Sequence, residues 1–415
     1  GCFVFLGTLV IAKEEKTYEG SIPLVTFGAL TACIIAIFTI AMGAVILIPT
    51  YMWSMGWISH IDAAMYRLIW WAFGHSSQQI NVAAHVSVWY AIAAIVFGAK
   101  PLSEKVSRTA FVLYIAFLQL ASAHHLLVDP GLSSTWKIFN TSYAMYLAVL
   151  ASMIHGLTVP GSIEVAQRAK GYTKGMFEWL RKAPWGNPVF SGMFISLIGF
   201  GFIGGISGVV MGTEQINIII HNTIYVPGHF HATVVIGTTL AFMALTYFLI
   251  PVLFRRQVFL PGLAKWQPYI FGISMMVFTM VMMGAGTLGV ERRHWDMAFT
   301  DAALSFDYPA SAYTLMGLVG ISGTLAIVGG GIYVLITVVS VFFGKRVESE
   351  SPYSGATTRL MKAPATPEPV GGHVAAGRFG FAAPETFAMA IFFLAIFVVY
   401  YAVNWKYLAS VWPMS

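Results

Sequence analysis

At 415 residues, of which 58% are hydrophobic and only 10% charged, the chain is too apolar to be a soluble globular domain. Its mean hydropathy of +0.75 is typical of a protein that crosses a membrane several times. The net charge of +6 is best explained by basic loops on one side of that membrane, so we expect membrane lipids and no nucleic acid as partners.

Nine apolar segments are close to or above the roughly 20 residues that a spanning helix needs. They cover 22–53, 63–98, 108–125, 135–160, 189–212, 223–254, 266–289, 312–343 and 383–404. The shorter apolar run 2–12 has no initiator Met and no signal-peptide pattern, and we interpret it as the tail of a helix whose beginning is absent. The predicted fold is an all-α, polytopic transmembrane bundle with about nine full spans plus one partial N-terminal span.

Lysine and arginine are concentrated in every second loop. At least two occur in each of the loops 13–21, 99–107, 161–188, 255–265 and 344–382. Three of the four intervening loops contain none: 54–62, 126–134 and 213–222. By the positive-inside rule the basic loops are cytoplasmic. We therefore predict an N-terminally truncated membrane bundle (1–344), a Pro-, Ser- and Gly-rich cytoplasmic linker (345–382) and a C-terminal transmembrane helix (383–415).

Three histidines in two spans lie at similar depth toward the outer side. His75 lies part-way along the span 63–98, and His124 and His125 end the span 108–125 just before Asp129. Adjacent helical residues diverge by about 100°, so both reach one metal only where the helix loosens at its end. Three neutral imidazoles suit copper, zinc or iron(II) and leave an open coordination position. The alternative interpretation is a polar helix end.

A His-x-His pair, His229 and His231, lies near the outer end of the span 223–254. Two residues apart on an α-helix, the side chains point about 200° apart, so they cannot share one metal. They can each hold a planar cofactor on one flank of the helix, which predicts two haems bound through imidazole. The alternative is two buried histidines satisfied by hydrogen bonds, although ionisable residues within a membrane are functional by default.

Arg292 and Arg293 lie in the predicted outer loop 290–311, against the charge pattern of the other outer loops. Haem propionates projecting outward would pair with them through charge-assisted, bidentate hydrogen bonds. The alternative is two solvated arginines.

Taken together, these motifs resemble subunit I of the haem-copper oxidase superfamily, in the same order and spacing over about 57–345. The matching segments are Trp70-Trp71-Ala-Phe-Gly-His75, the pair at 124–125, His221-Asn-Thr, Val226-Pro-Gly-His-Phe-His231 and the pair at 292–293. Asp129-Pro-Gly and Thr135-Trp-Lys, with the segments at 221–223 and 226–231, resemble its B-type branch.

The resemblance implies a cofactor for each histidine. His229 would bind the high-spin haem of the active site, and His231 the low-spin haem that feeds it electrons. His75, His124 and His125 would bind one non-haem metal, copper or iron.

The resemblance also implies that Arg292 and Arg293 hold haem propionates, with His221 among the outer polar groups nearby. The family's second ligand to the low-spin haem lies on an early helix. We therefore expect it on missing N-terminal helices or on a separate chain, because His60 and His85 are poorly placed to replace it.

Oxygen-reducing members of the B-type branch carry a tyrosine four residues after the first metal-binding histidine, where this chain has Gln79. Glutamine cannot donate an electron as that tyrosine does. Reduction of two NO to N2O and water takes only two electrons, which the haem iron and the second metal can supply. We therefore predict the catalytic subunit of a membrane nitric oxide reductase. Gln79 would be a weak metal ligand or a hydrogen-bond partner of bound NO.

Three alternatives stay open. The first is reduction of O2 to water, as in cytochrome c oxidase, with an electron and a proton from Tyr90, Tyr143 or Tyr146. Another oxidase branch places its tyrosine at a position near Leu118, one turn from Tyr114. The second alternative is a non-catalytic di-haem electron-transfer subunit, against which the three-histidine site argues. The third is a transporter without haem.

The outward position of the histidines predicts that electrons enter from the outer face. The donor would be a cytochrome c, acting directly or through a cupredoxin-like or cytochrome c-like second subunit, and quinol is an alternative. We expect a multi-pass protein of the prokaryotic cell (inner) membrane.

Overall fold

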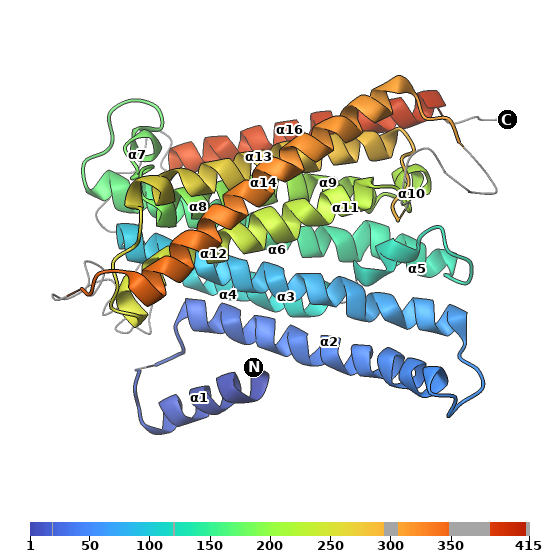
Figure 1. The fold of residues 1–415 in the computed structure, drawn as a ribbon, viewed down its shortest axis with the longest axis horizontal. Helices are drawn as coiled ribbons and strands as arrows, with labels where there is room; N and C mark the ends of the chain where they lie inside the picture. Colours follow the sequence, from blue (N-terminus) through green and yellow to red (C-terminus); the bar gives the residue numbers. More distant parts are fainter. Residues whose placement is uncertain (19, 119–120, 294–305, 348–381, 412–415) are drawn as a thin grey trace.

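A computed structural model describes the chain except for residues 19, 119–120, 294–305, 348–381 and 412–415 (Figure 1). The regular structure of the described residues is helical apart from two isolated bridges, Thr223 with Glu291 and Arg256 with Arg346. Nine helical segments in the described ranges are long and apolar enough to cross a membrane. The predicted all-α, polytopic bundle is therefore confirmed.

Five spans are single α-helices. They are α2 (Leu24–Ser54), α3 (Ala63–Phe97), α13 (Pro261–Thr287), α14 (Ala310–Phe343) and α16 (Pro384–Val411). Short helices flank the spans: α1 (Cys2–Glu14), α7 (Glu178–Arg181) and α10 (Glu214–Ile220). The predicted linker 345–382 falls almost entirely on residues outside the described part of the chain.

The other four spans change helix type along their length. The first joins α4 (Glu104–Leu113), a π-helical turn (Tyr114–Leu118) and a 3₁₀ turn (Ala121–Leu126). The second joins α5 (Ser134–Phe139), a π turn (Asn140–Ala144) and α6 (Met145–Ala169). The third joins α8 (Pro188–Gly199), a π turn (Phe200–Gly205) and α9 (Ile206–Met211). The fourth joins α11 (Tyr225–Phe230), a π turn (His231–Thr239) and α12 (Leu240–Leu253). Because π turns occur frequently at functional sites, we expect a functional site among these four spans.

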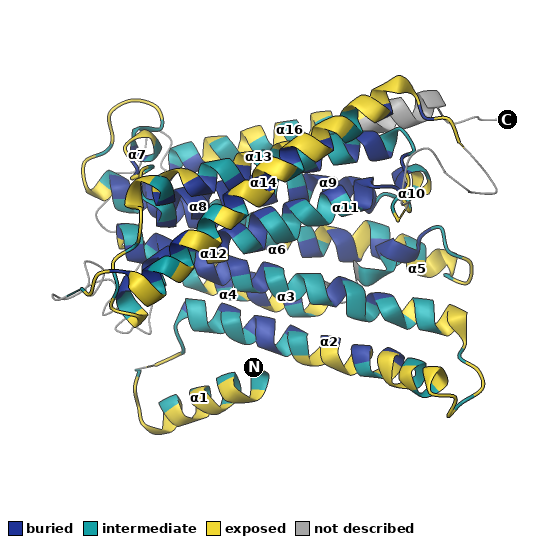
Figure 2. Cartoon of the chain, viewed as in Figure 1, coloured by how far each residue is buried: buried dark blue, intermediate teal, exposed yellow. Residues whose placement is uncertain are grey.

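Most spans lie roughly side by side, with α1 and α2 at one edge and α16 at the opposite edge, and α14 crosses the others diagonally (Figure 1). The short helix α7, within the basic loop 161–188, lies at one end of the bundle, and α5 and α10 lie at the other. Exposed residues concentrate on α1, α2 and α14, whereas α8 and α9 are mostly buried and α3 is buried mainly in its second half (Figure 2). The exposed residues of α2 and α14 include Phe38, Ile40 and Ile327, which suit contact with lipid or with further helices.

Helix α3 is fixed at both ends by its own sequence. The Asp62 carboxylate accepts hydrogen bonds from the backbone N–H groups of Ala64 and Met65, at 2.9 and 3.1 Å, which caps the start of the helix. Gly98 ends it with a left-handed backbone conformation (φ 68°). These caps set the position of a helix whose buried face carries His75.

Candidate metal centre

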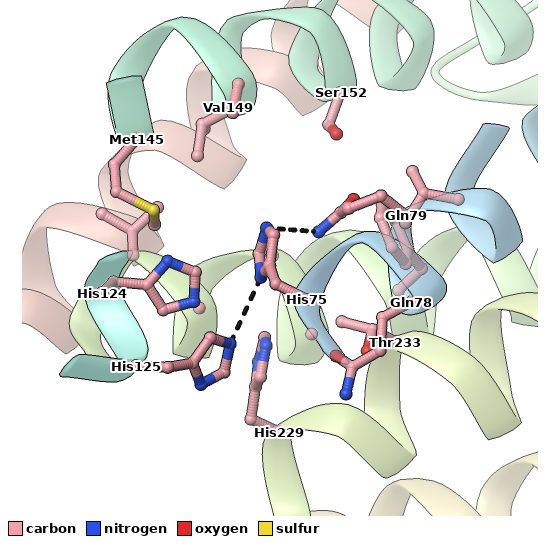
Figure 3. Close-up of a pocket in the computed structure, with 17 residues that line it drawn as sticks. His75, Gln78, Gln79, His124, His125, Met145, Val149, Ser152, His229 and Thr233 are labelled. Atoms are coloured by element: carbon pink, nitrogen blue, oxygen red, sulfur yellow. Dashed lines mark hydrogen bonds between the residues drawn. The ribbon is translucent and has the colours of Figure 1, made fainter. Parts of the chain in front are cut away.

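The structure brings three histidines together from two spans. His75 on α3 and His124 and His125 on the 3₁₀ turn each offer a ring nitrogen, and these nitrogens lie within 4.8 Å of one another (Figure 3). All three side chains are buried. No other cluster of metal-ligating side chains of this kind occurs among the residues that the structure describes.

The loosened helix end that the sequence required is present. His124 and His125 lie in the 3₁₀ turn Ala121–Leu126, and their ring centroids are 4.2 Å apart. The indole of Trp71 stacks on the His125 ring at 3.9 Å between centroids and an interplanar angle of 4°. This contact holds the His125 ring in one plane.

The donor set fits a divalent or monovalent transition metal. Two imidazole nitrogens, each about 2.0–2.1 Å from a tetrahedral ion, lie roughly 3.4 Å apart. Here His75 Nδ1 is 3.2 Å from His125 Nε2. Three neutral imidazoles suit copper, iron(II) or zinc and leave a coordination position for a small molecule.

His229 lines the same cavity as the three histidines (Figure 3). Its Nδ1 is 3.0 Å from Ser207 Oγ, and the Ser207 hydroxyl also contacts the carbonyl oxygens of Ile203 and Gly204. If the hydroxyl donates to a carbonyl, it accepts the Nδ1–H of His229. The Nε2 lone pair of His229 is then available to bind iron.

A glycine seam (Gly199, Gly204 and Gly208) brings this ring close to the neighbouring span. A Cβ atom on Gly208 would lie 2.8 Å from His229 Cε1. On Gly204 it would lie 2.8 Å from Thr233 Cγ2, and on Gly199 it would lie 2.4 Å from Ile236 Cγ2. The two spans therefore approach at distances that only glycine permits.

His231 faces different neighbours. Its Nδ1 donates a hydrogen bond of 2.7 Å to the Pro227 carbonyl, which leaves the Nε2 lone pair available. Its ring stacks with Phe230 and meets the edge of Phe278 on α13, at centroid distances of 4.7 and 5.4 Å. Each histidine of the pair thus presents Nε2, in separate surroundings, as two planar cofactors would need.

The predicted propionate region is a polar pocket at the end of the bundle that holds α10. Arg292 and Arg293 line it together with His221, Asp129 and Arg67. Asp129 makes a bidentate ion pair with Arg67, a residue that the sequence analysis did not single out. Residues 294–305 of the predicted outer loop 290–311 lie outside the described residues.

His221 and Arg292 are electrostatically constrained in this pocket. His221 Nε2 lies 3.7 Å from Asp129 Oδ1. Burial lowers the pKa of His221 below 6.5, and Arg67 and Arg292 lower it further, whereas Asp129 opposes the shift. Burial, followed by the neighbouring Arg293, lowers the pKa of Arg292. An anion placed in the pocket would relieve this crowding of cations.

Gln79 lines the cavity, and its side-chain nitrogen is 3.1 Å from His75 Nε2 (Figure 3). None of the described residues that line the cavity is a tyrosine. Tyr143 and Tyr146 are 60% and 53% exposed, which argues against a role at the buried centre. Tyr90 is buried and bonded to His155 and Ser107, and is not among the described lining residues.

Tyr114 is connected to the cavity through Ser152, a residue that could not be singled out from the sequence. Its hydroxyl is 2.9 Å from Ser152 Oγ, and Ser152 lines the cavity. Ser152 and Ser207 carried no recognisable signal in the sequence, because each is one small polar residue in an apolar span. His85, which was expected to be a poor haem ligand, bonds Thr238 Oγ1 at 2.9 Å.

The sequence of this chain is similar to those of known proteins. Residues 1–325 match the family described as "Cytochrome C and Quinol oxidase polypeptide I". Cytochrome c oxidase subunit 1 of Thermus thermophilus is 30% identical over 321 residues, covering 76% of this chain and 56% of that protein. The subunit 1 of Alkalihalophilus pseudofirmus is 24% identical over 321 residues, covering 74% and 44%.

A solved structure described as a heme-copper terminal oxidase dimer superposes with a TM-score of 0.74 and 26% identity, covering 89% of this chain and 64% of that one. The chain spans about half the length of the curated relatives that it matches. The family match nevertheless covers well over half of the chain. This chain therefore belongs to the haem-copper oxidase subunit I family.

Proposed function

We propose that this chain is the catalytic subunit of a membrane respiratory reductase that converts NO to N2O. The reaction is 2 NO + 2 e⁻ + 2 H⁺ → N2O + H2O. When bound, a high-spin haem on His229 and a copper or iron ion on His75, His124 and His125 supply the two electrons. His229 and the three clustered histidines line one cavity, which supports this pairing.

The absence of tyrosine from the described cavity wall carries the choice of NO over O2. Breaking the O–O bond in one step needs more electrons than two metal centres hold, and we expect an oxygen-reducing centre of the B-type branch to draw on a tyrosine. Position 79, one helical turn from His75, is occupied by a glutamine that bonds the His75 ring. An amide cannot take over the redox role of a phenol.

The side chains around the cavity suit a small uncharged gas. Val82, Val149, Val209 and Phe200 give it mainly apolar walls, which exclude ions and favour an apolar diatomic molecule. Ser152 places a hydroxyl at the wall, backed by the Tyr114 hydroxyl. This pair of hydroxyl groups can hold a proton beside the cavity in which one oxygen atom of NO would leave as water.

Electron supply would pass through a low-spin haem on His231. A further protein ligand to this haem would come from elsewhere in the protein or from a separate subunit. The donor would be a cytochrome c, a cupredoxin-like or cytochrome c-like subunit at the outer face, or quinol. Arg292 and Arg293 would pair with the propionates, and we place the complex in a prokaryotic inner membrane.

Reduction of O2 to water is the second candidate, because the relatives are named cytochrome c oxidase. A di-haem subunit that only transfers electrons is disfavoured, since electron transfer does not require three further imidazoles beside a haem.

Turnover of the intact complex with NO and with O2 separates these functions. We expect one N2O for every two NO consumed, and slow consumption of O2. Metal analysis should find one copper or iron in addition to two haem irons. A His75→Ala complex gives the background rate. Rapid O2 consumption with negligible N2O would overturn the assignment to NO.

A further inference from the structure

The two ring nitrogens of His75 face different partners. Nδ1 is 3.2 Å from His125 Nε2, on the side of the histidine cluster. Nε2 is 3.1 Å from the amide nitrogen of Gln79, one turn further along α3. The His75 side chain is buried, so bulk water does not compete for either nitrogen.

This geometry fixes which nitrogen can bind a metal. Nδ1 is the atom that lies 3.2 Å from His125 Nε2, so an ion shared between these two histidines would use the Nδ1 lone pair. A neutral imidazole then carries its proton on Nε2, which faces Gln79. A buried N–H in that position needs an acceptor, because leaving it unpaired costs about 1–3 kcal/mol.

We propose that Gln79 is the positioning residue of the second-metal site: its amide oxygen accepts the Nε2–H of His75 and thereby holds Nδ1 toward the metal. The inference rests on the metal site of the proposed function but not on the identity of the gas. In this arrangement Gln79 contacts the nitrogen of His75 that faces away from the metal. Gln79 does not itself have to bind the metal.

The proposal implies a turn of the amide. In this structure the amide nitrogen faces His75 Nε2, an arrangement in which Nδ1 carries the ring proton and donates it toward His125. Rotating the amide by 180° exchanges its oxygen and nitrogen, which occupy nearly equivalent positions. The ring proton then resides on Nε2, and the number of protons does not change. The amide NH2 is left free to donate to a molecule in the cavity.

Two substitutions test the hydrogen bond without changing the ligands. Gln79→Met keeps a similar length but offers at best a weak acceptor, whereas Gln79→Glu keeps a strong acceptor and adds negative charge. Gln78 lines the same cavity, and the described contacts give it no bond to His75. Gln78→Met is therefore the matched control.

The measurements are the affinity and the reduction potential of the second metal in the intact complex. The complex is depleted of this metal and titrated with copper(I) or iron(II), whichever the purified protein contains, against a competing chelator. Gln79→Met should weaken binding by about 10–100-fold, as loss of a ligand's outer partner does. The potential should rise in Gln79→Met and fall in Gln79→Glu, since an acceptor on the far N–H makes the imidazole a stronger donor.

Unchanged haem spectra in all three variants would show that the bundle is intact. The inference is overturned if Gln79→Met binds the metal as tightly as the parent complex, or if both Gln79 substitutions move the potential in the same direction. These readouts are independent of turnover. A complex that reduces only O2 would refute the proposed function and leave this inference standing.

Discussion

The two flanks of the helix that carries His229 and His231 hold the same side chain in different surroundings. His229 borders a cavity shared with three more imidazoles and is backed by Ser207. His231 is backed by the Pro227 carbonyl, and the rings described beside it are those of Phe230 and Phe278. We assign the proposed reaction to the flank that gathers four imidazoles, and electron transfer to the flank with aromatic neighbours.

Under the proposed function, this difference lets one helix separate chemistry from electron supply. On the His229 flank, every imidazole that we assign to the reaction comes from this chain. On the His231 flank, we assign one ligand of the proposed low-spin haem to this chain, and a further ligand would come from elsewhere. The neighbouring rings of Phe230 and Phe278 would suit an iron that only exchanges electrons.

The largest expected effect comes from removing each histidine of the pair separately. We expect His229→Ala to abolish the high-spin component of the reduced-minus-oxidised spectrum, and His231→Ala to abolish the low-spin component. Each should lower NO turnover by more than the roughly 100-fold that an outer partner can contribute, since a direct ligand is lost. Loss of the same spectral component in both variants would contradict the division between the flanks.

An intermediate effect is expected from a methyl group placed against His229. In Gly208→Ala the new Cβ would lie 2.8 Å from His229 Cε1, so the ring must move. Overpacking of this kind costs about 1–3 kcal/mol. We expect a shifted high-spin haem band and faster thermal inactivation, with the low-spin band unchanged.

Gly201→Ala is the matched control, because a Cβ at Gly201 meets nothing within 4 Å. If Gly208→Ala and Gly201→Ala behaved alike, the close approach at Gly208 would have no bearing on the His229 flank.

The smallest expected effect concerns pH. The folded protein lowers the pKa of His221 below the ordinary value of 6.5, so below that pH the unfolded chain binds more protons. The stabilising contribution of neutral His221 is therefore present above about pH 6.5 and is lost as the pH falls through the lowered pKa.

His221→Asn should make the thermal stability of the complex less dependent on pH in this window. His60→Asn, which changes a histidine exposed in the loop before α3, is the matched control. An unaltered pH profile in His221→Asn would show that the outer pocket does not bear on stability.

Much of this molecule could be predicted from its sequence, for identifiable reasons. Apolar length alone located the nine spans, because the thickness of a membrane sets the length of a helix. His75, His124 and His125 could be grouped by depth, because loop charges orient the spans. The span 135–160 was predicted too short, since the helix continues to Ala169 beyond the apolar stretch.

Partners across spans could not be predicted. Arg67 and Asp129 are 62 residues apart, and their pairing depends on how two helices are rotated about their axes. The bond from Gln79 to the far nitrogen of His75 likewise depends on the orientation of the ring. The four π turns left no recognisable pattern either, since a π turn differs from an α turn by a single residue.

The glycine seam has a consequence for how this protein can change. Gly199, Gly204 and Gly208 let backbone, not side chains, set the gap between two spans. The size of the residues at these points therefore sets how closely the span that carries His229 approaches its neighbour. One added methyl group in the neighbouring span would displace His229 while every histidine around the cavity stayed the same.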